Sequence, residues 1–454
     1  MKIQFTDTTF RGGQQSLLAT RLRTETMLPI IEKLDNAGFH ALDIWGGATF
    51  ESCLKYLKED PWERLKKIGK AAKNTKLQML LYGRNILGYK PYADDIIEAF
   101  IRKSIENGIS ILRISDPLND LNNMEAAIKS TKKENGHAQL AITYTNSPVH
   151  TLEYFINLAK SMECIGADSI CVQDTAGILL PQTTYNLIME LKNNINIPIH
   201  LHSNCTSGLA SMTYLKAVEA GVDSIDTAIS PLALGTSQPA VEVMDATFKN
   251  LGYQTNLKAD ILAEGELMLK PIREAALNTG LMNTKLLGIN INTLKYDIPS
   301  EMEYHIKSQL KAHNAKNKFN EVIEELEKVR FELGYPPLTI PISHIIATQS
   351  ILNILNGERY KPAIEEIKYL VRGVYGKTTL PINENIIRTI LGGQEQEFTP
   401  ISTNTINNIK EFYQKEEDIL TYILFPDISI EFFKHRQAVE LQIDSDNINN
   451  IYPV

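Results

Sequence analysis

Short apolar runs alternate with amphipathic stretches through the first half of the chain. Eight runs carry apolar residues at consecutive positions, which is typical of strands buried on both faces. They are Ile3–Thr6, Ala41–Trp45, Leu77–Leu81, Ile109–Ile114, Gln139–Tyr144, Ser169–Val172, Pro198–Leu201 and Ser224–Thr227. Helical periodicity marks intervening segments that include Thr24–Ala37, Asp94–Asn107, Leu152–Ile165, Gln182–Asn193 and Leu209–Ala220. Strands that alternate with helices predict parallel βαβ units.

One joint between helix and strand recurs four times along this half of the chain. A glycine ends the helix in "AGFHALDIW", "NGISILRIS", "IGADSICVQ" and "AGVDSIDTA", at Gly38, Gly108, Gly166 and Gly221. Glycine readily adopts the left-handed conformation that closes a helix. Eight units with a repeated joint predict a (β/α)8 TIM barrel over residues 1–258. A doubly wound sheet is the alternative, but the GxGxxG that it would carry after the first strand is missing.

Helical periodicity replaces this alternation from about Lys258 onward. The predicted helices are Ala259–Ala276, Glu303–Ala312, Asn320–Leu333, Pro362–Val371 and Glu411–Tyr422. Residues 259–454 are therefore predicted to form a C-terminal helical region that packs on the barrel and wraps its strand-end mouth. Within this region "GVYGKTT" resembles a phosphate-binding loop, but Val371 stands where that loop requires its first glycine.

Composition and charge narrow the range of functions. The 454 residues are 43% hydrophobic and 22% charged, with a net charge of −8. No basic patch favours nucleic acid, and no apolar run approaches the roughly 18 residues that span a bilayer. The four cysteines are scattered without a CxxC pair, so neither a zinc site nor a disulfide framework is indicated. A reducing cytoplasm is the expected location.

Polar residues or glycines follow every predicted strand, at the end of a TIM barrel where catalytic groups lie. In chain order they are Asp7, Arg11, Gly46, Gly47, Tyr82, Arg84, Asp116, Thr145, Gln173, Asp174, His202, Asn204 and the loop Ser230–Pro239. Asp7 and His202 could bind a metal ion, with Gln173 and Asn204 as neutral amide ligands. A hydrogen-bonded polar plug at the barrel mouth is the alternative. His200 shares one side of a strand with His202 and is interpreted as a packing residue.

Several longer motifs carry a resemblance to a known family. They include "QQSLLATRLRTETMLPI", "WGGATFESCLKYLKEDPWERL", "SGLASMTYLKAVEAGVD", "DTAISPLALGTSQPA" and "LGYPPL". In these motifs the chain resembles the biotin-dependent carboxyltransferases. That family includes the α subunit of oxaloacetate decarboxylase, the carboxyltransferase domain of pyruvate carboxylase and the transcarboxylase large subunit. The resemblance extends over nearly the whole chain and implies the same barrel fold.

The resemblance also implies a metal site of four ligands, which this chain keeps only in part. Asp7 matches the aspartate of the family's Asp-Thr-Thr-x-Arg-Asp run. The histidines of its His-x-His pair correspond to His202 and Asn204, and the carboxylated lysine corresponds to Gln173. Glutamine cannot be carboxylated, and asparagine lacks an imidazole nitrogen. The resemblance therefore implies at most a weakly bound divalent ion (Mn, Zn, Co or Mg).

Further catalytic positions of the family are also changed. Gly12 and Gln14 stand where the family has aspartate and histidine. Tyr82 replaces a substrate-binding arginine, and Ile340 replaces the threonine that moves a proton to or from biotin, while Ser343 is retained. Isoleucine has no hydroxyl group and cannot relay a proton.

The retained candidates for substrate binding are Arg11, Gln15, Gly46, Gly47 and Arg84. Arg11 could bind an anionic substrate or pair with an acidic residue. The glycines of the "WGGATFESC" loop could cradle a ligand or simply let the chain turn.

These losses favour a degenerate carboxyltransferase that acts as a structural or regulatory partner in a biotin-dependent complex. An active enzyme with an altered metal site, exchanging CO2 between carboxybiotin and pyruvate or oxaloacetate, is the alternative. A binding protein for an unrelated small acid is a third hypothesis. The resemblance implies a homodimer or a heterodimer with an active paralogue. No Met-Lys-Met biotin-attachment motif follows, so any biotin is expected on a separate carrier protein.

Overall fold

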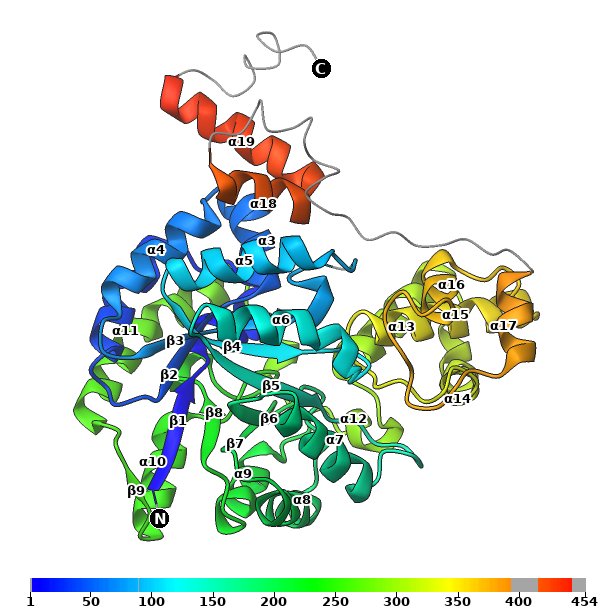
Figure 1. Ribbon diagram of the computed structural model, residues 1–454, viewed down its shortest axis with the longest axis horizontal. Helices are drawn as coiled ribbons and strands as arrows, with labels where there is room; N and C mark the ends of the chain where they lie inside the picture. Colours follow the sequence, from blue (N-terminus) through cyan, green and yellow to red (C-terminus); the bar gives the residue numbers. More distant parts are fainter. Residues whose placement is uncertain (1, 89, 393–414, 443–454) are drawn as a thin grey trace.

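Eight parallel strands close into a barrel in the computed structural model, which describes residues 2–88, 90–392 and 415–442. The sheet order runs from β2 through β8 to β1, and pairing between β1 and β2 closes the ring (Figure 1). A short ninth strand, β9, pairs with β1. The bounds are β1 Lys2–Asp7, β2 Ala41–Trp45, β3 Lys76–Tyr82, β4 Ile109–Ser115, β5 His137–Thr143, β6 Ser169–Asp174, β7 Ile199–Ser203, β8 Ser224–Thr227 and β9 Gln254–Thr255. Each predicted strand is present, with ends displaced by two residues at most.

Helices surround the barrel and bury the outward-facing apolar residues of its strands. Their bounds are α1 Gln14–Leu18, α2 Thr24–Leu34, α3 Gly47–Ser52, α4 Pro61–Ala71, α5 Asp94–Glu106, α6 Leu121–Lys133, α7 Leu152–Cys164, α8 Pro181–Asn194, α9 Ala210–Glu219, α10 Val241–Asn250 and α11 Ala259–Asn278. Leu262 and Leu269 of α11 belong to the hydrophobic core of the barrel. The core therefore continues past residue 258, where the sequence pattern changes.

The repeated helix–glycine–strand joint adopts the conformation that the sequence predicts. The φ angles of Gly38, Gly108, Gly166 and Gly221 are 95°, 114°, 101° and 96°. A side chain at these positions would strain the backbone, because L-residues other than glycine rarely adopt positive φ.

A second group of helices stands beside the barrel and has a hydrophobic core of its own (Figure 1). Its helices are α12 Asn292–Tyr296, α13 Ser300–Ala312, α14 Phe319–Glu332, α15 Ile342–Asn356, α16 Glu365–Val371 and α17 Glu384–Leu391. We call α12–α17 the helical group. The sequence pattern misses α15, because this helix packs against both α13 and α14 and its apolar residues do not form a single stripe.

The last two described helices, α18 (Glu416–Leu424) and α19 (Pro426–Leu441), pack elsewhere, on α5 and on the chain that follows α3 (Figure 1). Trp62 donates its indole hydrogen to Thr421 Oγ1 over 3.0 Å, and Phe425 stacks on Phe50 with ring centroids 5.6 Å apart. The C-terminal region thus occupies two places on the barrel. Residues 411–414 of the predicted helix Glu411–Tyr422 lie outside the described residues.

The "GVYGKTT" loop joins the helical group to the barrel. The backbone N–H of Lys377 donates to Asp120 Oδ2 over 2.8 Å, and Asn123 Nδ2 donates to the carbonyl of Tyr375 over 2.8 Å. A Cβ on Gly376 would lie 2.4 Å from Asn123 Nδ2, so glycine permits this close approach. The loop docks on the start of α6, which agrees with the sequence argument against a phosphate loop. No helix within the described parts of the chain is long and apolar enough to cross a membrane.

We predict that Gly38→Ala destabilises the protein much more than Gly166→Ala. Both glycines have similar positive φ, and this conformation costs an L-residue about 1–2 kcal/mol. A Cβ at residue 38 would in addition lie 2.1 Å from the carbonyl oxygen of Asn256, whereas nothing lies within 4 Å of a Cβ at residue 166. Urea unfolding of the two variants measures the difference, and equal shifts in midpoint would contradict the prediction.

Candidate functional site

The Asp226 carboxylate lies inside the barrel and is fully buried. Arg113 of β4 donates to both of its oxygens, and one of these bonds is 3.1 Å long. On β7, His200 Nε2 and His202 Nδ1 each lie 2.7 Å from one of the two carboxylate oxygens. Burial opposes ionisation, but the Arg113 guanidinium and the two imidazoles outweigh it and hold the pKa of Asp226 well below its usual range. This network joins three strands beneath the barrel mouth.

Both ring nitrogens of His200 make hydrogen bonds. Its Nε2 donates to Asp226, and its Nδ1 accepts from Gln139 Nε2 over 3.2 Å. Burial lowers the pKa of His200, which favours the neutral ring. These contacts match the interpretation of His200 as an interior packing residue.

His202 differs because only one of its ring nitrogens is engaged. Its Nδ1–H donates to Asp226, and within the described residues Nε2 has no hydrogen-bond partner. A histidine fixed in this way presents a lone pair on Nε2, as metal-ligating histidines do when a carboxylate orients them.

Two buried oxygens near the strand ends also lack partners within the described structure. Asp7 Oδ1 accepts from Thr9 Oγ1 over 2.6 Å, but Asp7 Oδ2 accepts nothing. Burial raises the pKa of Asp7 to about 7. Gln173 Oε1 is likewise buried without a partner, and Gln173 pairs in register with His202. Asp7, Gln173 and His202 therefore each have one polar side-chain atom without a hydrogen-bond partner among the described residues.

Asn204 belongs instead to a chain of hydrogen bonds that crosses the barrel mouth. Its Nδ2 donates to the carbonyl of Thr175 over 2.8 Å, and its Oδ1 accepts from Gln238 Nε2 over 2.6 Å. Gln238 Oε1 in turn accepts from Thr8 Oγ1 over 2.7 Å. A Cβ on Gly12 would lie 2.8 Å from Gln238 Oε1, so the absent side chain at residue 12 makes room for Gln238. We call this chain of hydrogen bonds the polar plug.

These residues do not fit the four-ligand metal site that the resemblance implies. The Asn204 oxygen is already an acceptor in the polar plug, and Gln173 can offer only a neutral amide oxygen. No group of three or more His, Cys, Asp or Glu side chains that could hold a metal ion occurs in the described residues. A tight divalent site usually needs more charged or imidazole ligands than Asp7 and His202 provide.

Arg11 is paired with an acidic residue. Its Nε and Nη2 lie 2.7 and 2.6 Å from Asp43 Oδ2, and both side chains are buried. Gly46 lies beside it, since a Cβ there would be 3.7 Å from Arg11 Cδ. A Cβ on Gly47 would lie 2.7 Å from the Leu87 carbonyl oxygen, so this glycine allows the loops after β2 and β3 to meet.

The other predicted site residues are spread more widely. Tyr82 ends β3, and Arg84, in the loop after it, is partly exposed. Gln15 lies on α1 and is exposed. In the helical group, Ile340 lies two residues before α15 and is 36% exposed. Ser343 lies in the first turn of α15 and is buried, with no partner for its hydroxyl in the described structure.

Asp174 holds the turn after β6. It accepts hydrogen bonds from the backbone N–H groups of Gly177, Ile178 and Leu179 and from the Ser203 hydroxyl. This carboxylate thus shapes the loop behind Gln173.

Arg113 and Asp226 lie within strands and so stand outside the strand-end positions that the sequence singles out, whereas Gln238 belongs to the loop Ser230–Pro239 that follows β8. Arg113 and Asp226 lie within "ILRIS" and "SIDT". Opposite charges within two apolar strands are a signal of a buried pair, since an unpaired charge there would be costly.

Two family models together match most of the chain. The model described as HMGL-like matches residues 2–267, and the one described as conserved carboxylase domain matches residues 293–451. A pyruvate carboxylase subunit of Methanocaldococcus jannaschii is 47% identical over 448 residues, covering 96% of this chain and 79% of that protein. The chain belongs to the biotin-dependent carboxyltransferase family. The family expected from the sequence motifs is confirmed.

Other members of the biotin-dependent carboxyltransferase family align over similar spans. The methylmalonyl-CoA carboxyltransferase 5S subunit of Propionibacterium freudenreichii is 37% identical, covering 96% of this chain and 88% of that protein. The 2-oxoglutarate carboxylase large subunit of Hydrogenobacter thermophilus is 39% identical, covering 97% of this chain and 69% of that protein. The solved carboxyl transferase domain from Rhizobium etli pyruvate carboxylase superposes with a TM-score of 0.84 at 27% identity, covering 95% of this chain and 77% of that one. The predicted barrel with a C-terminal helical region is confirmed.

We predict that Asp226→Asn lowers the free energy of unfolding by about 3–5 kcal/mol, because it leaves the buried Arg113 guanidinium without a counter-ion. Urea unfolding followed by circular dichroism measures this change. Glu125→Gln is the control, since it removes the same charge from an exposed ion pair with Lys129 and should change stability little. Equal effects of the two substitutions would contradict the structural role of Asp226.

Proposed function

We propose that this chain is a carboxyltransferase-type subunit whose own catalysis is impaired or lost, and that it acts as a structural or regulatory partner in a biotin-dependent complex. The observation that carries the proposal is the polar plug, in which hydrogen bonds to Thr175 and Gln238 hold the Asn204 side chain and its neutral amide oxygen stands in place of an imidazole nitrogen. Gln173 supports it, because a glutamine cannot carry the carboxylate that a modified lysine would supply. Ile340 supports it as well, since it cannot move a proton.

An active carboxyltransferase with an altered metal site is the second candidate. The open atoms of Asp7, Gln173 and His202 favour it, because they could hold an ion weakly at the strand ends. The 47% identity to a protein named as a pyruvate carboxylase subunit favours it too. In this alternative the reaction exchanges CO2 between carboxybiotin and pyruvate or oxaloacetate.

We predict that the purified protein, incubated with Mn²⁺ and dialysed, retains far less than one ion per chain. We also predict that it decarboxylates oxaloacetate with free biotin at the background rate, because neither Gln173 nor Asn204 replaces the charge and imidazole that the family uses. Metal analysis and an oxaloacetate-consumption assay measure the two quantities. One tightly bound ion per chain together with turnover above background would overturn the proposal in favour of the active enzyme.

A restored variant sharpens this experiment. The triple substitution Gln173→Lys, Asn204→His and Ile340→Thr should raise metal retention, whereas Ile340→Thr alone should leave it unchanged. Ile340 lies in the helical group and not at the strand ends, so the single variant controls for the general effects of substitution. If the triple variant folds but gains no metal, the assignment of these positions to the ligand set is wrong.

The proposal includes a separate biotin carrier and a cytoplasmic location. The relatives named as subunits support a multi-chain assembly. The four free cysteines, Cys53, Cys164, Cys171 and Cys205, support a reducing compartment.

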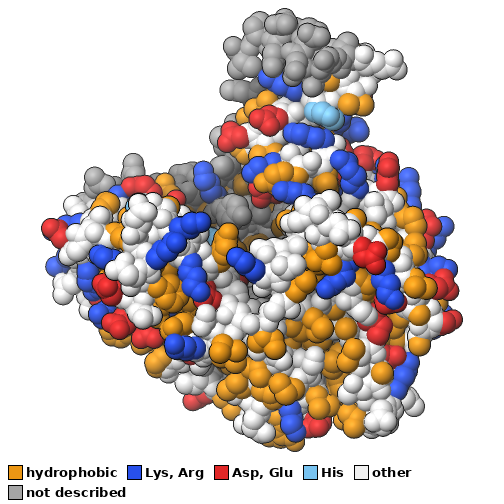
Figure 2. Space-filling view, turned by 180° about the vertical axis from the view of Figure 1, so that it is seen from behind, with side chains coloured by type: hydrophobic (Ala, Val, Ile, Leu, Met, Phe, Trp, Pro, Cys, Tyr) orange, Lys and Arg blue, Asp and Glu red, His pale blue; other side chains and the backbone are white. Residues whose placement is uncertain are grey.

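The proposal also includes a homodimer or a heterodimer with an active paralogue, formed through an exposed apolar surface. Figure 2 shows hydrophobic side chains gathered on the lower part of the face seen from behind. Ile289 and Ile291 are 69% and 68% exposed, and the Asn290 N–H between them donates to the Thr206 carbonyl after β7 over 2.8 Å. Met212 at the start of α9 is also exposed. The Ile289 side chain lies against Gly208, two residues before α9, so these exposed apolar side chains come from neighbouring segments and favour an interaction site.

We predict that Ile289→Asp combined with Ile291→Asp converts the dimer to a monomer, because two charges would be buried in an apolar interface. Light scattering after size-exclusion chromatography measures the mass. Val439→Asp is the control, since Val439 is 65% exposed on α19 and away from this surface. A dimer that survives the double substitution would rule out this surface.

A further inference from the structure

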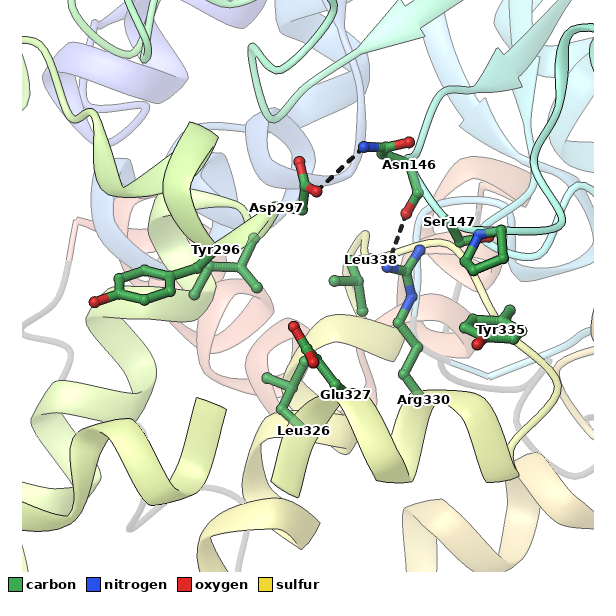
Figure 3. A pocket seen from close by; sticks show the side chains of 11 residues that line it. Asn146, Ser147, Tyr296, Asp297, Leu326, Glu327, Arg330, Tyr335 and Leu338 are labelled. Carbon is green, nitrogen blue, oxygen red and sulfur yellow. Dashed lines mark hydrogen bonds between the residues drawn. The ribbon is translucent and has the colours of Figure 1, made fainter. Parts of the chain in front are cut away.

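A cavity of about 520 Å³ lies where the loop after β5 meets the helical group (Figure 3). Asn146 comes from the barrel side, whereas Asp297, Glu327 and Arg330 come from the helical group. None of the residues that the sequence assigns to the carboxyltransferase site lines this cavity. Its volume falls within the range of small-molecule pockets.

Arg330 is a buried cation that no carboxylate of the described residues contacts directly. Only 7% of the residue is exposed, and its three hydrogen bonds all go to neutral acceptors: the Pro336 carbonyl at 3.1 Å, the Asn146 carbonyl at 2.9 Å and Thr145 Oγ1 at 2.8 Å. Among the described residues, no carboxylate lies within 4.0 Å of its guanidinium. Since arginine has five N–H donors, two remain for a ligand.

This arrangement favours an anionic group in the cavity. Removing a guanidinium from water without a directly bonded counter-ion is costly. Burial lowers the pKa of Arg330 to about 10, although the charges of Asp297 and Glu327 act in the opposite direction. A carboxylate would supply a directly hydrogen-bonded anion, which Arg330 lacks among the described residues, and its two oxygens suit the paired donors of a guanidinium.

Two carboxylates also line the same cavity. Figure 3 shows the Asp297 side chain across the open space from Arg330, and the Glu327 side chain on the same helix as Arg330, α14, three positions earlier. Asp297 accepts one hydrogen bond from Asn146 Nδ2 over 3.1 Å, and Glu327 has no hydrogen-bond partner in the described structure. These carboxylates would repel a second anionic group but attract an ammonium group. Apolar side chains complete the wall, and they include Ile298, Leu326 and Leu338.

We propose that this cavity binds an α-amino acid with an apolar side chain, with its carboxylate on Arg330 and its ammonium group beside Asp297 and Glu327. A simple carboxylic acid would pair with Arg330 but not with Asp297 and Glu327, and a simple amine would pair only with these two carboxylates. Because residues of both the barrel and the helical group line the cavity, the ligand strengthens the contact between them. This inference goes beyond the proposed function, since the cavity is present whether or not the subunit catalyses carboxyl transfer.

Isothermal titration calorimetry of the full-length protein with L-leucine, L-methionine and L-phenylalanine tests the proposal. We expect at least one of them to bind at millimolar concentrations or below. We expect the matching des-amino acid and des-carboxyl amine to bind at least roughly tenfold more weakly. If none of the three amino acids binds, or if a des-amino analogue binds as tightly as its parent, the proposal is wrong.

Substitutions locate the binding site. Glu327→Gln and Arg330→Gln should each weaken amino-acid binding roughly tenfold or more. Lys328→Gln and Glu324→Gln are matched controls, because they remove the same charges from exposed positions on α14 outside the cavity and should leave binding unchanged. Arg330 also holds Thr145 and Asn146, so Glu327→Gln decides the test if Arg330→Gln fails to fold. Binding unaffected by Glu327→Gln would overturn the proposal.

Discussion

One buried carboxylate organises the interior of this barrel. Asp226 accepts hydrogen bonds from Arg113, His200 and His202, and through His200 the network reaches Gln139, so four of the eight strands share one polar cluster. A barrel interior can hold an arginine and an aspartate only if each satisfies the other, because a single unpaired charge there would cost several kcal/mol. The network also fixes the His202 ring through Nδ1, so that Nε2 is the ring nitrogen without a hydrogen-bond partner in the part of the chain that the structure describes.

The mouth combines two different arrangements. Gln238 and Asn204 close part of it with the polar plug, and the absence of a side chain at Gly12 gives Gln238 its place. Asp7, Gln173 and His202 keep open atoms. The scaffold beneath the mouth is fully hydrogen-bonded at Asp226, whereas neutral amides stand at residues 173 and 204, and this contrast is the physical basis for proposing a partner subunit with impaired chemistry. The Arg330 cavity lies at a different junction and depends on neither arrangement.

In the C-terminal region, hydrophobic periodicity does not predict every helix. In α15, Ile342, Ile345 and Ile346 are buried together with Ser343 and Gln349, because this helix is surrounded by its neighbours. A helix buried on several sides has no polar stripe, so its sequence carries no amphipathic signal. The helices α18 and α19 dock away from the helical group through contacts such as the hydrogen bond from Trp62 to Thr421. These two residues are 359 positions apart in the sequence.

The strands, the barrel and the family can all be predicted from the sequence, because consecutive apolar runs, the glycine joints and the long motifs are local signals. It also identified Asp7, Gln173, His202 and Asn204 as strand-end residues, since the carboxyl ends of parallel strands meet at one edge. Which of these side chains make hydrogen bonds depends on the folded arrangement of the strands and loops. The Asn204 oxygen is bonded by Gln238, 34 positions away, and Asp226 joins Arg113 across 113 positions. Such pairings depend on how distant strands are placed, and no local pattern specifies them.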